Sequence, residues 1–232
     1  MSQYRQSPFA NIPPVVKNLL IINIICYIAQ WAFSKHFNLD VFAAYFFDSP
    51  NFKPWQVITY MFMHSLDSPM HLIGNMFALF IFGPTLEYTM GSKRFFNYYF
   101  ICGLGAVLIQ NIVQCFEIYN ITGHLTASPL EQETIEKIAQ IYYGGVIGAS
   151  GAIFGLLLAF GMLFPNVEMF IIPIPFPIKA KYLVTGYIVM ELFLGYEQFA
   201  GDSVAHFAHI GGALVGFIII KIWGLKSPPQ YY

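Results

Sequence analysis

The sequence predicts an all-α, polytopic membrane protein in which six transmembrane helices form a bundle. Its 232 residues are 57% hydrophobic and only 10% charged, whereas about 25% of the residues in an ordinary soluble domain are charged. The hydrophobic residues form continuous runs close to the roughly 20 residues that a helix needs to cross a bilayer. They do not alternate with polar residues, as they would in the strands of an outer-membrane barrel.

Six hydrophobic runs define the expected spans. They cover residues 15–33, 70–90, 95–116, 148–164, 181–197 and 205–223. The connection 34–69 is too rich in aromatic residues for a solvated loop, so we expect it to lie in or dip into the membrane interface. The connection 117–146 is polar and holds a short helical pattern over 129–141. Because neither an internal repeat nor a second domain is visible, we expect one membrane domain over residues 1–232.

The positively charged residues predict the orientation in the membrane. Six spans place both termini on one side, together with the second and fourth connections. Eight of the 11 lysine and arginine residues fall on that side: Arg5, Lys17, Lys93, Arg94, Lys179, Lys181, Lys221 and Lys226. By the positive-inside rule, both termini are cytoplasmic. A short chain in which no signal peptide is recognisable favours a bacterial inner membrane.

Charge and cysteine content narrow the range of partners. The net charge of −1 argues against a nucleic-acid partner. The three cysteines all lie in apolar runs, so they indicate no disulfide framework.

A few polar residues interrupt the even-numbered spans near their N-terminal ends. His71 and Asn75 are four residues apart and share one helix face. From the helical rise, Ser150 lies roughly 22 Å above the cytoplasmic end of its span, His209 roughly 18 Å and Asn75 roughly 24 Å. All are therefore inside the bilayer at a similar depth, where polar side chains usually face a cavity or each other.

Glycines allow the fourth and sixth spans to approach closely. Small residues four positions apart occur in both: Gly151 with Gly155, and Gly212 with Gly216. Ser150 and His209 are then within hydrogen-bond reach. A serine beside a histidine suits acyl transfer, with His209 as general base and general acid.

The oxyanion of such a reaction needs donors. The Ser150 N–H and the side chains of His71 and Asn75 are the expected ones. No Asp or Glu is expected beside His209 at that depth, so the sequence predicts a Ser–His dyad. Water must reach it through a cavity open to the extracytoplasmic side.

Three motifs resemble those of the rhomboid family of intramembrane serine proteases. Residues 148–151 match the family's GxSG, and Ala208-His209 with Gly212 and Gly216 match its AHxxG…G. His71 and Asn75 match its HxxxN. The likeness also covers the order and spacing of the spans, over roughly residues 10–225, so the expected bundle is rhomboid-like.

The resemblance implies roles for these residues. Ser150 would be the nucleophile, His209 the base, and His71 and Asn75 oxyanion-hole residues. Residues expected to support the site are Gly148, which shapes the active-site turn, Phe154, which packs on the histidine, and Gly151, Gly212 and Gly216. The substrate would be another membrane protein, cut in or near its transmembrane segment.

The resemblance implies neither a metal nor a cofactor. It also extends to segments outside the three motifs. Span 181–197 and the loop 199–205 resemble the family's lateral gate and cap. Where the family often has Trp-Arg, this chain has Trp55-Gln56, which bears on a loop-anchoring or lipid contact and leaves the chemistry intact.

Several alternatives stay open from the sequence. Ser150 can be a simple helix cap. His206, His209 and His71 can be weighed as zinc ligands, although we expect no Glu or Cys to complete such a site and no HExxH motif is present. An inactive rhomboid-like chaperone that binds transmembrane helices is the first rival function. The second is a transporter or proton channel that uses His71, Glu191 and His209. Glu191 lies in the middle of an expected span. It can be a water-facing carboxyl, a protonated carboxyl or part of a gate.

Overall fold

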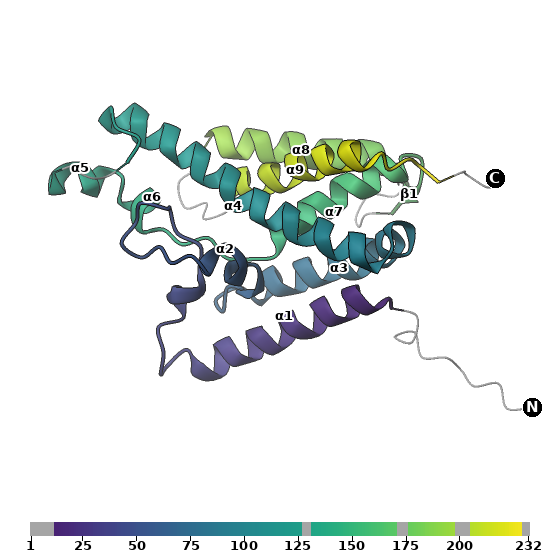
Figure 1. The fold of residues 1–232 in the computed structure, drawn as a ribbon, viewed down its shortest axis with the longest axis horizontal. Helices are drawn as coiled ribbons and strands as arrows, with labels where there is room; N and C mark the ends of the chain where they lie inside the picture. The colour runs from purple at the N-terminus through teal and green to yellow at the C-terminus, as the bar shows by residue number, and fades with distance from the viewer. Residues whose placement is uncertain (1–11, 127–130, 171–175, 198–204, 229–232) are drawn as a thin grey trace, which may run out of the picture.

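The computed structural model describes residues 12–126, 131–170, 176–197 and 205–228 (Figure 1). This part of the chain is mostly helical, and the longer helices lie side by side in an elongated bundle. These helices are α1 (Pro14–Phe33), α3 (Pro69–Met90), α4 (Ser92–Thr122), α7 (Ser150–Leu163), α8 (Ala180–Glu197) and α9 (His206–Trp223). Among the described residues, α1, α3, α4 and α9 are long and apolar enough to cross a membrane, and α7 is a shorter apolar helix.

The helix bounds lie close to the expected spans, with one clear difference. Helix α4 continues to Thr122, six residues past the predicted end at 116, and has 31 residues. The polar residues in its last turns do not break a helix. Gly123 does end it, in the left-handed region at φ 76°, where its N–H caps the Tyr119 carbonyl.

Short elements occupy the connections. Between α1 and α3 lie the 3₁₀ helix η2 (Leu39–Phe42), helix α2 (Gln56–Thr59) and the 3₁₀ helix η3 (Tyr60–Phe62). The helical pattern expected over 129–141 is divided at Ile138 into α5 (Gln132–Lys137) and α6 (Ala139–Tyr143).

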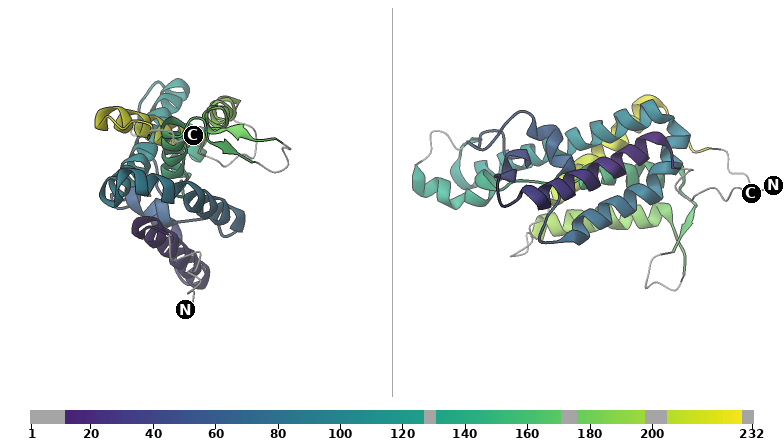
Figure 2. Two further views of the ribbon diagram at one scale, coloured as in Figure 1. Left: turned by 90° about the vertical axis from the view of Figure 1, so that its right-hand side faces the viewer. Right: turned by 90° about the horizontal axis from the view of Figure 1, so that it is seen from below.

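An unpredicted two-stranded hairpin follows α7 and projects from the side of the bundle (Figure 2). Strand β1 (Glu168–Met169) pairs antiparallel with β2 (Ile178–Lys179), with Glu168 opposite Lys179 and Met169 opposite Ile178. Strands of two residues are too short to show a period in the sequence.

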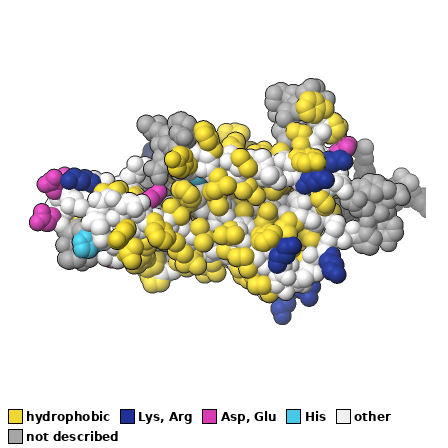
Figure 3. All heavy atoms as spheres, turned by 90° about the horizontal axis from the view of Figure 1, so that it is seen from above, with side chains coloured by type: hydrophobic (Ala, Val, Ile, Leu, Met, Phe, Trp, Pro, Cys, Tyr) yellow, Lys and Arg dark blue, Asp and Glu magenta, His cyan; other side chains and the backbone are white. Residues whose placement is uncertain are grey.

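Helix α7 forms the centre of the core. It packs against α3, α4, α8 and α9, and most of its side chains are buried. By contrast, large apolar side chains on α1 remain exposed, Ile25 and Trp31 among them. Figure 3 shows hydrophobic side chains over the middle of one face and charged ones toward its two ends. This distribution fits a bundle surrounded by lipid, with its polar ends outside.

Glycines make the close packing around α7 possible. A Cβ on Gly212 of α9 would collide with the Gly151 carbonyl of α7, and a Cβ on Gly155 would lie 3.2 Å from the Gly212 carbonyl. The two backbones therefore touch along the line that the spaced glycines predicted.

The N-terminus of α1 is capped by a side chain of α3. The N–H groups of Val15 and Val16, which have no carbonyl partner within the helix, donate to the carboxylate of Glu87 at 3.1 and 2.8 Å. The Ser92 hydroxyl donates to the same carboxylate at 2.6 Å. Glu87 thus joins α1, α3 and the start of α4 at one end of the bundle.

Part of the connection between α1 and α3 is buried. The Gln56 side chain, which replaces the arginine often present in the family, is buried and donates to the carbonyls of Val41 and Asn51. Its own carbonyl accepts from the Lys53 N–H at 2.9 Å. Gln56 therefore holds the connection together internally.

Candidate active site

A turn with a glycine at positive φ leads into α7. Gly148 has φ 124°, a conformation that L side chains rarely adopt, and a Cβ there would lie 2.7 Å from the Nε2 of His71. The Gly148 N–H donates to the Tyr60 carbonyl at 2.9 Å. Both the backbone conformation and the close histidine therefore require glycine at 148, and the connection between α1 and α3 holds the turn in place.

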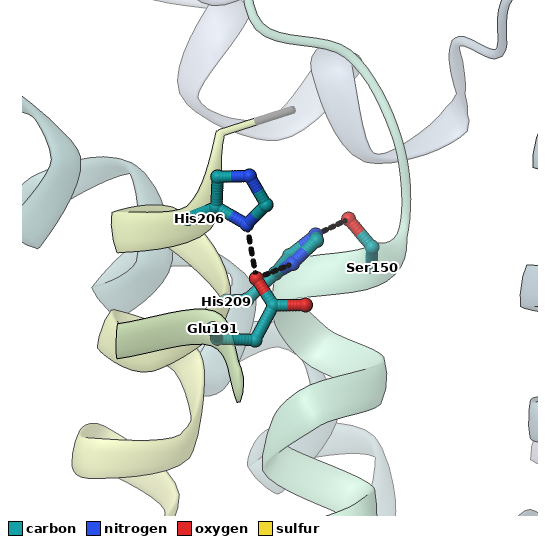
Figure 4. A network of polar contacts seen from close by, with 4 residues as sticks. All are labelled: Ser150, Glu191, His206 and His209. Atoms are coloured by element: carbon teal, nitrogen blue, oxygen red, sulfur yellow. Dashed lines mark hydrogen bonds and ion pairs between the residues drawn. The ribbon is translucent and has the colours of Figure 1, made fainter. Parts of the chain in front are cut away.

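Ser150 and His209 meet across the helix pair α7 and α9. The Oγ of Ser150 lies 2.7 Å from the Nε2 of His209, although the residues are 59 positions apart (Figure 4). The Ser150 hydroxyl is directed to the histidine, a hydrogen bond that the helix-cap interpretation did not predict.

The face of the histidine ring is covered by an aromatic ring. Phe154, one turn after Ser150, stacks on His209 with centroids 4.4 Å apart and planes 6° from parallel. The stacking and the bond to Ser150 hold the imidazole in one orientation.

A carboxylate lies on the other side of the histidine, which the sequence analysis did not predict. The Oε2 of Glu191 is 2.9 Å from the Nδ1 of His209 and 2.6 Å from the Nδ1 of His206 (Figure 4). The expectation that no carboxylate lies beside His209 was wrong, and the hydrogen-bonded chain continues from Ser150 and His209 to Glu191 and His206.

The depth comparison missed Glu191 because it included only spans that start on the same side of the membrane. Helix α8 runs into α9 through a short connection, so residues near the end of α8 lie level with the start of α9. Glu191 is six residues before the end of α8 and His209 is three residues after the start of α9, which is roughly 9 Å and 5 Å along the two helices. Counting from the shared connection would have found the pair.

The predicted oxyanion residues lie on α3. His71 reaches the turn before Ser150, because its Nε2 is the atom nearest to a Cβ built on Gly148. Its Nδ1 accepts the Ser65 N–H at 3.4 Å, which leaves Nε2 as the nitrogen that carries the proton. Asn75 is buried and donates one amide N–H to the His71 carbonyl at 2.9 Å.

His64 packs behind His71 with its ring edge against the other ring, at a centroid distance of 5.2 Å. Its backbone exchanges two hydrogen bonds with the side chain of Gln30, whereas its ring nitrogens have no partner among the described residues. Burial, and then the neighbouring His71, lower the pKa of His64 to about 4. His64 is therefore a neutral structural residue.

The side chains of Glu191, His206 and His209 could also be considered as metal ligands, since their ligand atoms lie within 4.8 Å of one another. His71, the third residue of the zinc alternative, is not in this group. Two ligands about 2.0 Å from a tetrahedral zinc ion lie roughly 3.3 Å apart, but His206 Nδ1 and Glu191 Oε2 are 2.6 Å apart. The spacing is that of hydrogen bonds.

Most of the residues expected to form the site are thus together. Gly151, Gly212 and Gly216 line the contact of α7 with α9, where Gly216 also faces the Tyr98 hydroxyl. The segment expected to act as a lateral gate, 181–197, is described as helix α8. The loop expected to act as a cap, 199–205, lies almost entirely outside the described residues, which exclude 198–204.

The apolar helices and their exposed hydrophobic side chains define a polytopic helical membrane protein. Its family follows from comparison with known proteins. Residues 51–225 match the Rhomboid domain, and the chain belongs to the Rhomboid family. It is 30% identical to "Rhomboid protease AarA" of Providencia stuartii, over 87% of this chain and 69% of that protein.

Two further relatives come from eukaryotes. "Rhomboid-like protein 11, chloroplastic" of Arabidopsis thaliana is 25% identical over 91% of this chain and 65% of that protein. "Presenilin-associated rhomboid-like protein, mitochondrial" of Homo sapiens is 28% identical over 69% of this chain. The match covers only 38% of the human protein.

Proposed function

We propose that this protein is an intramembrane serine endopeptidase that cuts the transmembrane segments of other membrane proteins. The observation that carries the proposal is the 2.7 Å contact between the Ser150 Oγ and the His209 Nε2. It joins an alcohol to a base inside an apolar bundle, as nucleophilic catalysis requires.

The chemistry follows from that contact. The Ser150 Oγ attacks the carbonyl carbon of the scissile peptide as its proton passes to His209 Nε2. His209 returns this proton to the leaving amine, and the C–N bond breaks to give an acyl-enzyme. Water then gives a proton to His209, and the hydroxide attacks the carbonyl carbon of the ester. The bond between this carbon and the Ser150 Oγ breaks as His209 returns the proton to the serine oxygen. The products are a carboxylic acid and the restored serine.

The developing oxyanion needs donors that are already in place. Ser150 is the first residue of α7, so its N–H belongs to the unpaired donors at a helix N-terminus. The His71 Nε2 beside Gly148 supplies a second donor, and the Asn75 side chain is the third that we propose.

The proposed membrane arrangement is a single rhomboid-like domain over 1–232, with six transmembrane helices in the bilayer of a bacterial inner membrane. The start of α1 and the end of α9 lie at one end of the bundle (Figure 1), which supports cytoplasmic termini on the same side. Water would enter from the extracytoplasmic side. The proposed partners are transmembrane proteins and lipid, with no nucleic acid, metal or cofactor.

The rival functions fit less well. An inactive rhomboid-like chaperone has no need of an assembled Ser150–His209 pair. A transporter would need polar groups through the whole depth of the membrane, whereas α7 continues from Ser150 with apolar and glycine residues alone.

The test is labelling of the purified protein in detergent with a serine-reactive fluorophosphonate. Ser150→Ala and His209→Ala should both abolish labelling. Ser92→Ala is the matched control, because Ser92 also begins an apolar helix but donates to Glu87, and it should label like the wild type. Equal labelling of all variants, or none where a known intramembrane serine protease is labelled, would contradict the proposal.

A second assay separates protease from transporter. The protein is reconstituted in vesicles with a transmembrane substrate, and cleavage is followed on a gel. Ser150→Ala should stop cleavage. Proton or solute flux that survives Ser150→Ala, with no cleavage by the wild type, would favour the transporter.

A further inference from the structure

We infer that Glu191 is a positioning residue that completes a Ser150–His209–Glu191 triad, with His206 holding the carboxylate in place. The inference rests on the proposed function and deepens it. The carboxylate belongs to α8, a helix that carries neither the nucleophile nor the base.

The two nitrogens of His209 are used in opposite directions. Its Nδ1 faces Glu191 Oε2 at 2.9 Å, and its Nε2 faces Ser150 Oγ at 2.7 Å. A carboxylate only accepts hydrogen bonds, so Nδ1 must carry the proton of the neutral imidazole. The lone pair is then on Nε2, next to the serine that has to be deprotonated. Glu191 thus selects the reactive tautomer.

Glu191 also stabilises the charge that forms during the reaction. When the Ser150 proton reaches Nε2, His209 becomes an imidazolium with a carboxylate 2.9 Å from its Nδ1. The proton on Nδ1 stays on His209, and Glu191 remains ionised throughout. Because Glu191 is buried and His209 is partly buried, screening by water is weak and the attraction is larger than it would be in water.

His206 explains why the carboxylate keeps this position. The same Oε2 accepts from His206 Nδ1 at 2.6 Å, and both Glu191 and His206 are less than 9% exposed. A buried carboxylate in a membrane helix is costly unless it is hydrogen-bonded. Two imidazole donors on one oxygen satisfy it and fix its direction toward His209.

The first test compares Glu191→Gln with Glu87→Gln. Both replace a buried carboxylate by an amide, but Glu87 caps α1 and is twelve residues along α3 from Asn75, roughly 18 Å. Glu191→Gln should lower kcat for cleavage about 10²- to 10⁴-fold with little change in KM, as when a triad loses its carboxylate. Glu87→Gln should lower the thermal midpoint and leave kcat within about threefold of the wild type.

The pH profile distinguishes positioning from a purely structural role. The titratable groups that face His209 in the described part of the chain are Glu191 on α8, His206 on its own helix and His71 on α3. In Glu191→Gln, the acidic limb of the rate of fluorophosphonate labelling should move to lower pH, because the imidazolium loses its anionic partner. A structural role would lower the folded fraction at every pH and leave the limb where it is.

A spectroscopic test needs no catalysis. In ¹⁵N-histidine-labelled protein, the wild type should show His209 protonated at Nδ1, assigned by loss of the signal in His209→Ala. Glu191→Gln should lose this signature, and Glu191→Asp should keep it with part of the activity. Failure of all labelling with the signature present would reject the protease and leave the contact standing. Wild-type kinetics and an unchanged signature in Glu191→Gln would overturn the inference and leave the protease.

The metal alternative has its own outcome. The wild type is treated with a chelator and then with zinc. Unchanged labelling after the chelator agrees with a hydrogen-bonded carboxylate. Labelling that is lost with the chelator and restored by zinc would overturn the inference in favour of a metal bound by Glu191, His206 and His209.

Discussion

The ring of Phe154 and the imidazole of His209 lie face to face, 4.4 Å apart and nearly parallel. Both rings are half-buried, and the contact joins the first turns of α7 and α9. It restrains the imidazole in a direction that its hydrogen bonds, which lie in the ring plane, do not control.

Removing this stacking should therefore slow cleavage without unfolding the protein. Stacked rings are worth about 0.5–1.5 kcal/mol, so Phe154→Leu should lower kcat roughly 2- to 10-fold. Phe154→Tyr keeps an aromatic ring and should retain most of the wild-type kcat. Phe96→Leu is the control, since Phe96 is exposed and its ring contacts Phe100, away from His209. Equal rates for Phe154→Leu and the wild type would show that the stacking does not matter.

Gly148→Ala should abolish activity. The new Cβ would be forced into a conformation with φ 124° and would lie 2.7 Å from His71 Nε2, so the turn and the histidine must both move. Gly123→Ala provides the comparison, because Gly123 also has a positive φ but no atom of the described residues lies within 4 Å of a Cβ built there. It should cost about 1 kcal/mol in stability and keep the cleavage rate. The measurements are cleavage rate and thermal midpoint.

Gly212→Ala should destabilise the bundle. Its Cβ would collide with the Gly151 carbonyl, and backbone cannot yield as a side chain can. We expect a fall of about 2–4 kcal/mol in the free energy of unfolding, measured by denaturation in mixed micelles. Gly186→Ala in α8 adds the same methyl group where the described part of the chain has no atom within 4 Å, and its stability should be equal or higher. A stable Gly212→Ala would mean that α7 and α9 are farther apart than described.

Glu87→Ala should loosen the start of α1. Two N–H groups and the Ser92 hydroxyl would lose their acceptor, at a cost of about 1–3 kcal/mol in stability. Hydrogen exchange should rise at Val15 and Val16 and stay unchanged in α7. Glu168→Ala, at an exposed carboxylate on β1, is the control and should have no effect on either.

Acid should destabilise the folded protein through His64. The pKa of this buried histidine is lowered to about 4 in the folded state, against about 6.5 in an unfolded chain. Between these values the unfolded state binds more protons, so the free energy of unfolding falls as the pH drops from about 6.5 to about 4, by at most about 3 kcal/mol. His64→Phe should flatten the stability profile in this range, whereas loss of an exposed imidazole in His124→Gln should not. An unchanged slope in His64→Phe would contradict the assignment.

The sequence predicted the helices well because lipid imposes a simple rule. Continuous apolar runs mark α1, α3 and α9 to within one or two residues, and glycine spacing marks where α7 meets α9. Ser150 and His209 were found because both lie near the start of spans that begin on the same side of the membrane.

Glu191 was missed because it lies on a helix of opposite direction, which the comparison of depths did not include. Other features were not predictable for physical reasons. The hairpin β1–β2 is too short for a pattern, and the end of α4 depends on the conformation of Gly123. Gln56 could be read only as a departure from the family, whereas the structure gives it internal hydrogen bonds.

The extra length of α4 has a consequence for the forces that stabilise the protein. Its 31 residues extend roughly 46 Å, well beyond a hydrocarbon core of about 30 Å. On its extension, Ile118 packs with Phe46 and Ile138 in a small core separate from the main one. Inside lipid, helices associate by van der Waals packing and hydrogen bonds, but a core in water depends on the hydrophobic effect. We expect this end of α4 to lie outside the lipid, and we therefore expect urea and cold to act on the small core before they act on the main one.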